Sequence, residues 1–312
     1  GVFFTTNGGQ SWSQIKEGIP TICIKDMTIQ KRECDLIVAS FGRGYYILDD
    51  YSPLRSIDKT FFDKEAQLFK VKDALMYLPT DVKGSMGSMP YLAPNPDFGA
   101  IFSYYVKDTK FKLKKDLRKE LEDSLFKKGL PIPMPTDAQL DDEEKEISPY
   151  LTFTITDQAG NVVKQIKAAT AKGVRRINWD LRYEMPGTVQ PADKKVNTLA
   201  DGQNGPFVLP GSYKVNLALS VAGKTKEIAE PVSFNVVSLN NVTLPADNKV
   251  EVTDFYKKAM TLSRKMREAQ AYGEELQKRV NYARQAFFQF DQSPELQKKA
   301  QALADELDEL IL

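Results

Sequence analysis

The residue types that most often perform catalysis are sparse in this chain. Its 312 residues contain no histidine, which removes the commonest general base and the commonest transition-metal ligand. Ser-His-Asp and Cys-His catalysis and histidine-ligated zinc are therefore excluded for this sequence. The only cysteines, Cys23 and Cys34, fall at opposite ends of one predicted hairpin, so we expect two separate thiols and no disulfide.

Pairs of carboxylates are the remaining route to hydrolysis, because glycoside cleavage needs two acids that face each other. Asp49 and Asp50 are adjacent on a predicted strand, so their side chains should point to opposite faces. The acidic run 141–144 lacks the glycine-punctuated spacing of a calcium loop and is better interpreted as the start of a helix. We predict no catalytic residue, no metal site and no cofactor here, and leave open whether a longer parent protein is an enzyme.

A turn over residues 5–12 has the residue types that fix a tight hairpin. An asparagine side chain can accept backbone N–H groups two residues on, and a Gly-Gly pair tolerates positive φ. The tryptophan that follows offers a large apolar ring for packing between neighbouring sheets. A structural role is favoured over direct ligand binding for its pattern residues, which are Thr5, Asn7, Gly9, Ser11 and Trp12.

The strand that leads into this turn has a second copy. A pattern of glycine, bulky residues, β-formers and an acid or amide begins at Gly1 and again at Gly44. A period of roughly 40–45 residues is typical of β-propeller blades, whose sheets need neighbours on both faces. Arg43 lies between two glycines on the rim opposite the Asn7 turn, so it is a candidate ligand-binding residue. The alternative is that Arg43 only holds a neighbouring loop.

The turn resembles the Asp-box (BNR repeat) of sialidase-like and sortilin-like propellers, with Asn7 where aspartate is usual. Residues 19–50 resemble the last blade of secreted bacterial sortilin-like propeller proteins. Residues 177–183 and 209–213 resemble the immunoglobulin-like domain that follows the propeller in those proteins. The resemblance implies that the Asp-box is a structural clasp. It also implies an extracytoplasmic location, in the periplasm, on the outer membrane surface or in the medium.

These patterns predict a mainly β fold with an α tail. We expect the chain to begin inside a blade and therefore to require the rest of its own propeller. The loop 184–210 has no periodicity, and we expect it to pack against the propeller, with ligand contact as the alternative. The predicted parts are terminal blades of an incomplete β-propeller over 1–80, a linker over 81–97, an immunoglobulin-like β-sandwich over 98–240 with a helical insertion over 107–148, and an antiparallel helical hairpin over 250–312.

The helical tail has an apolar or small residue at alternating spacings of three and four, which is the seam of a coiled coil. One interpretation is that the hairpin buries this seam internally and caps the structure. The other is that Phe287, Phe288 and Phe290 form an interface with a partner.

Composition narrows the functional classes. The formal net charge is +1, so no global field attracts nucleic acid, and no apolar run is long enough for a membrane-spanning helix. The favoured hypothesis is a fragment of a non-catalytic extracytoplasmic propeller protein that binds a protein or peptide in the cell envelope. A glycan-binding or sialidase-like glycoside hydrolase propeller, with its active site in missing blades, is one alternative. A structural assembly subunit is the other.

Overall fold

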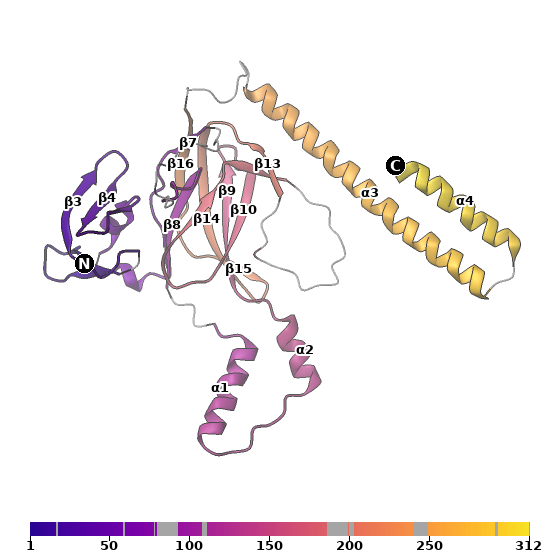
Figure 1. Ribbon diagram of the computed structural model, residues 1–312, viewed down its shortest axis with the longest axis horizontal. Helices are drawn as coiled ribbons and strands as arrows, with labels where there is room; N and C mark the ends of the chain where they lie inside the picture. The colour runs from indigo at the N-terminus through magenta and orange to yellow at the C-terminus, as the bar shows by residue number, and fades with distance from the viewer. Residues whose placement is uncertain are drawn as a thin grey trace. The chain divides into compact units, whose positions relative to one another are not determined.

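The computed structural model describes residues 1–16, 18–58, 60–77, 79, 93–107, 111–185, 199, 203–239, 249–290 and 293–311. It is mainly β with a C-terminal helical region, as the sequence predicts (Figure 1). The chain divides into two compact units, one formed by 1–181 with 210–243 and the other by 182–209 with 244–312. Most of the predicted linker 81–97 lies outside the described residues.

The first unit begins with a hairpin and a three-stranded antiparallel sheet. The hairpin pairs β1 (Val2–Phe4) with β2 (Ser13–Ile15), and the sheet has the order β3-β4-β5. The sheet strands are β3 (Ile24–Gln30), β4 (Asp35–Ser40) and β5 (Tyr45–Leu48). Two short 3-10 helices follow, η1 (Ser52–Ser56) and η2 (Phe61–Asp63).

The β3-β4-β5 sheet is apolar on both faces. Ile29 pairs with Leu36 on one face, and Ile37 pairs with Ile47 on the other. Because side chains alternate along a strand, a sheet with one buried face normally carries polar residues on its other face. This sheet therefore has the composition of one that is covered on both sides.

Two larger sheets form the rest of the first unit. One has the order β10-β9-β14-β16-β7, with β15 beside β14, and the other has the order β11-β8-β6. All pairs are antiparallel except β7 with β16. The strands are β6 (Ala66–Leu68), β7 (Ala74–Met76), β8 (Ala100–Val106), β9 (Tyr150–Asp157), β10 (Val162–Ala169), β11 (Gly173–Trp179), β14 (Gly211–Val221), β15 (Lys224–Glu227) and β16 (Val232–Ser238).

The position of β6 and β7 differs from the predicted boundary of the blade region, 1–80. β6 pairs with β8, and β7 pairs with β16, so both strands belong to the two larger sheets. Local sequence shows that these runs are extended. It does not show which distant strand completes their hydrogen bonds, because that partner is set by the shared core.

Aromatic rings join the two larger sheets. Trp179 of β11 is fully buried, and its ring centroid lies 6.0 Å from that of Phe234 on β16. The ring centroids of Phe102 on β8 and Phe153 on β9 lie 6.5 Å apart in a stacked arrangement. Trp179 is therefore part of the core that the two sheets share.

The predicted insertion contains two helices, α1 (Lys114–Lys127) and α2 (Asp137–Lys145). A capping box starts α2, because Thr136 and Gln139 exchange side-chain to backbone hydrogen bonds of 3.3 and 2.9 Å. Arg118 joins the helices, with its Nε 2.6 Å from Glu143 Oε1.

The second unit holds two strands and the helical tail. β12 (Arg182–Met185) pairs antiparallel with β13 (Gln203–Phe207), so the described ends of the predicted loop 184–210 form a hairpin, while 186–198 lies outside the described residues. α3 (Lys249–Phe290) contacts β13 and runs antiparallel to α4 (Pro294–Ile311) (Figure 1). Within the described ranges no helix is both long and apolar enough to cross a membrane.

Candidate functional site

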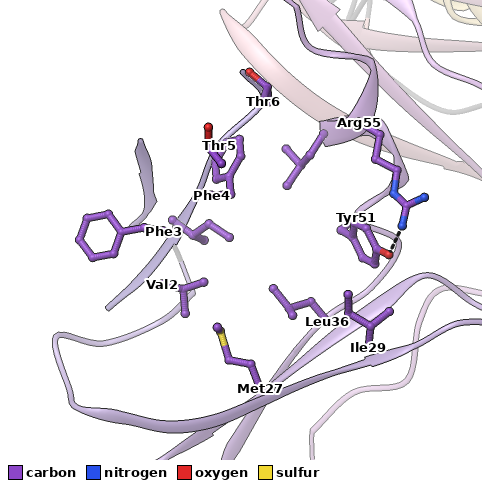
Figure 2. A pocket seen from close by; sticks show the side chains of 12 residues that line it. Val2, Phe3, Phe4, Thr5, Thr6, Met27, Ile29, Leu36, Tyr51 and Arg55 are labelled. Carbon is purple, nitrogen blue, oxygen red and sulfur yellow. Dashed lines mark hydrogen bonds between the residues drawn. The ribbon is translucent and has the colours of Figure 1, made fainter. Parts of the chain in front are cut away.

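An apolar groove of about 310 Å³ lies between the β1–β2 hairpin and the β3-β4-β5 sheet (Figure 2). Val2 and Phe4 line it from the hairpin, and Met27, Ile29 and Leu36 line it from the sheet. Val2 is buried, whereas Met27 and Ile29 are exposed. The groove therefore presents uncovered apolar surface that water wets unless another segment or a ligand covers it.

Arg55 and Tyr51 supply polar groups at one side of this groove. Arg55 Nη2 lies 2.5 Å from the Tyr51 hydroxyl oxygen, and the guanidinium carbon lies 5.0 Å from the centre of the Tyr51 ring. Both residues lie at η1, four positions apart, so one short helical turn places them together. A guanidinium has five N–H donors, which exceeds what one hydroxyl can accept. An apolar surface beside such a group suits a peptide with an apolar side chain next to a carbonyl or carboxylate.

A second pocket, of about 380 Å³, carries six acidic side chains and two cationic ones. Several of its acids hold the protein together. Asp35 Oδ1 accepts a hydrogen bond of 2.9 Å from the Asp50 backbone, and Lys72 Nζ lies 3.6 Å from Asp50 Oδ1. Arg176 Nη2 donates to the backbone carbonyl oxygens of Asp49 and Asp50. These contacts support a structural role for Asp49 and Asp50.

Side-chain hydrogen bonds close the Asn7 turn as expected, but Asn7 accepts from the backbone four residues on and not two. The Ser11 backbone donates to Asn7 Oδ1 over 2.9 Å, and the Gly9 backbone donates to Thr5 Oγ1 over 3.0 Å. Asn7 Nδ2 donates to Ser11 Oγ over 2.7 Å. The Trp12 side chain is 61% exposed, in contrast to the expected packing between blades. The turn thus fixes its own backbone without the tryptophan.

The residues that line the groove do not include the other predicted site residues. Arg43 is exposed in the β4–β5 turn, which is closed by a 2.9 Å bond from the Ser40 backbone to the Gly44 carbonyl. Phe288 and Phe290 are exposed near the end of α3, and Phe287 is partly buried.

Sequence reasoning missed the groove, although two signals were present. Met27 and Ile29 alternate with polar residues on β3, which marks an apolar face. Tyr51 and Arg55 have the four-residue spacing of neighbours on a helical turn. Neither signal indicates that the hairpin lies opposite this face.

Neither a metal site among the described residues nor a match to a known protein adds to this description. In the part of the chain that the structure describes, no group of three or more His, Cys, Asp or Glu side chains could hold a metal ion. Comparison with protein families, curated proteins and solved structures finds no match. A function for this chain is therefore inferred from the geometry of the described residues.

Proposed function

We propose that this chain belongs to an extracytoplasmic, sortilin-like propeller protein that binds a peptide or protein partner and is not itself catalytic. The Asp-box resemblance supports the propeller and the extracytoplasmic location. Two structural features agree with a blade. The β3-β4-β5 sheet is apolar on both faces, and the Asn7 turn is closed by its own side-chain hydrogen bonds.

The strand connections support an immunoglobulin-like sandwich as the following domain. The β10-β9-β14-β16-β7 sheet faces the β11-β8-β6 sheet. β7 runs parallel to β16, which is the last strand of its sheet in the sequence. β6 and β7 correspond to one first strand that is divided between the two sheets, and its β7 half runs parallel to the final strand, β16. This arrangement is compatible with such a sandwich.

The groove in Figure 2 is the observation that carries the binding function. It combines exposed apolar side chains with a guanidinium at its side, and peptide sites often join an apolar pocket to a few polar anchors. We infer a preferred ligand with an apolar side chain adjacent to an acidic group or a free carboxylate, because Arg55 can form a charge-assisted hydrogen bond with either.

Selection of a displayed peptide library on the 312-residue chain tests this function. Enriched peptides should share an apolar residue next to an acidic one, and fluorescence anisotropy should give their affinities. Ile29→Ser and Arg55→Ala should each weaken binding about tenfold, which is typical of a central contact residue.

Ile47→Ser is a matched control, because Ile47 is similarly exposed on the opposite face of the same sheet. It should leave peptide affinity unchanged. Equal losses for Ile29→Ser and Ile47→Ser would contradict a site in the groove. Binding to a glycan array that survives both groove variants would favour the glycan-binding alternative instead.

A further inference from the structure

The loop that joins α1 to α2 exposes a cluster of apolar side chains. The Phe126 side chain in the last turn of α1 is 76% exposed, and Met134 in the loop is 94% exposed. Leu130 and Ile132, which lie between them in the sequence, are also exposed. We call these four side chains the apolar tip. Large apolar side chains gathered in one short segment mark a surface that contacts something apolar.

The contacts that hold α1 to α2 lie at the other end of the helix pair. Arg118 Nε lies 2.6 Å from Glu143 Oε1, and the Lys114 backbone N–H donates to Glu146 Oε2 over 2.7 Å. These contacts join the first half of α1 to the end of α2. The tip can therefore be covered without breaking the contacts between the helices.

The prolines of this loop make it apolar on every side. Pro131, Pro133 and Pro135 fix their own φ and keep the preceding residues extended, which favours a polyproline II conformation with three residues per turn. The loop is neither helix nor strand. Residues three positions apart then share a side, so the three sides pair Leu130 with Pro133, Pro131 with Met134, and Ile132 with Pro135. A segment that is apolar all round suits surroundings that cover it from several sides.

Much of the polar backbone around the tip is already paired or missing. The three prolines have no N–H group, and an N–H group without a partner is costly to remove from water. At the end of α1, the Gly129 N–H donates to the Phe126 carbonyl oxygen over 3.0 Å. The Leu130 N–H donates to the Leu125 carbonyl oxygen, also over 3.0 Å, which completes a Schellman motif. The Thr136 capping box closes the start of α2, so transfer of this segment to an apolar medium costs less than for an ordinary loop.

The charges beside the tip are positive. Residues 124–136 contain Lys127 and Lys128 and no acid, and both lysines are exposed. A lysine can lay its aliphatic stem on an apolar surface and keep its ammonium group in water or among phosphates. Apolar side chains next to such lysines match the two layers of a bilayer interface, where acyl chains lie below anionic headgroups.

We propose that the apolar tip inserts into the interface of a lipid bilayer that contains anionic lipids, as a shallow anchor that does not span it. Phe126, Leu130, Ile132 and Met134 enter the acyl boundary, while Lys127 and Lys128 remain among the headgroups. A groove on a protein partner is the poorer occupant, because such grooves hold a polyproline segment by part of its circumference. None of these residues lines the groove between β1–β2 and β3-β4-β5.

Vesicle flotation of the 312-residue chain tests the proposal. The chain should float with vesicles of phosphatidylcholine mixed with phosphatidylglycerol. Phe126→Ser/Met134→Ser should lower its affinity for them at least about tenfold, because both side chains lose their apolar transfer free energy. Phe288→Ser/Met266→Ser is the matched control, since it removes the same two residue types from exposed positions on α3. The control should leave the affinity unchanged.

The charge contribution has its own matched pair. Lys127→Gln/Lys128→Gln should weaken binding to the mixed vesicles several-fold. Lys298→Gln/Lys299→Gln, which changes two adjacent exposed lysines on α4, should not.

Met134→Trp reports insertion directly. The emission of the added indole should shift to shorter wavelength when the mixed vesicles are added, whereas that of Met266→Trp should not. The proposal is overturned if the parent chain does not float, if the two Phe/Met double variants lose affinity equally, or if the Met134→Trp emission does not move. Binding of a polyproline-recognising domain to the tip without any binding to vesicles would also overturn it.

Discussion

Arg176 of β11 holds the backbone at Asp50, 126 residues earlier in the chain. Its Nη2 lies 2.7 Å from the Asp50 carbonyl oxygen and 2.5 Å from that of Asp49. Asp50 has a positive φ of 44°, a conformation that non-glycine residues seldom adopt unless their surroundings fix it. One arginine therefore fixes the end of β5 against the larger sheets.

Arg176→Ala should loosen the β3-β4-β5 sheet without unfolding the aromatic core. A hydrogen bond from a charged donor contributes about 1.5–3 kcal/mol, and an exposed one such as this should lie at the low end. Hydrogen exchange should accelerate in β4 and β5 while β9 and β14 stay protected. Arg175→Ala, the neighbouring exposed arginine, is the control and should leave exchange in β5 unchanged.

Gly99→Ala should strongly destabilise the larger sheets. Gly99 has a φ of +123°, and a Cβ built there would lie 1.9 Å from the Trp179 carbonyl oxygen. Because that oxygen belongs to the backbone of a core strand, the collision cannot be relieved by a side-chain rotation. We expect a loss above about 2 kcal/mol, measured by urea denaturation.

Gly129→Ala separates this collision from simple backbone strain. Gly129 also has positive φ, at +67°, but a Cβ there meets nothing within 4 Å. Its cost should be about 1 kcal/mol, the usual penalty of a left-handed conformation. Equal losses of stability for Gly99→Ala and Gly129→Ala would show that the collision with the Trp179 carbonyl oxygen does not contribute to the loss.

Local patterns predicted the elements that are stabilised locally. The helix α3, with its three-four spacing, and the tight Asn7 turn each depend on residues within a few positions of one another. The pairing of β6 with β8, and of β7 with β16, depends on contacts between distant segments that no local pattern encodes. For the same reason, the groove was not predicted from either of its walls.

The long seam of α3 shows the same limit. Its spacing correctly predicted a helix that pairs with the next one. It could not show which residues of α3 lie beside α4, because the periodicity is the same along the whole helix.

The Asn7 turn should depend on the asparagine more than on the tryptophan. Asn7→Ala removes the acceptor of the Ser11 backbone bond and should cost about 1 kcal/mol. Trp12→Ala removes a ring that is mostly exposed, so stability should change by less than about 0.5 kcal/mol. Thermal denaturation measures both, and a loss of several kcal/mol for Trp12→Ala would mean that the ring is buried in solution.

The pairing of α1 with α2 should weaken in acid. Hydrogen bonds from the Arg118 guanidinium lower the pKa of Glu143, and the carboxylates of Glu143 and Glu122 raise the pKa of Arg118. A carboxyl group whose pKa is lowered by folding stabilises the fold above its unfolded pKa, about 4.3 for Glu. That contribution is lost as the pH falls through the lower, folded value. Amide exchange in α2 should therefore accelerate relative to β9 when the pH falls from about 7 to about 3.

Glu143→Gln should reproduce this loosening at neutral pH, because the amide keeps the shape of the side chain but not its charge. The rate of amide hydrogen exchange in α2 should also become less sensitive to acid, because the carboxylate on α2 that pairs with Arg118 is gone. Asp123→Asn, an exposed acid on α1, is the matched control and should retain the parent pH profile. If Glu143→Gln and Asp123→Asn give the same profile as the parent chain, the ion pair does not hold the two helices together.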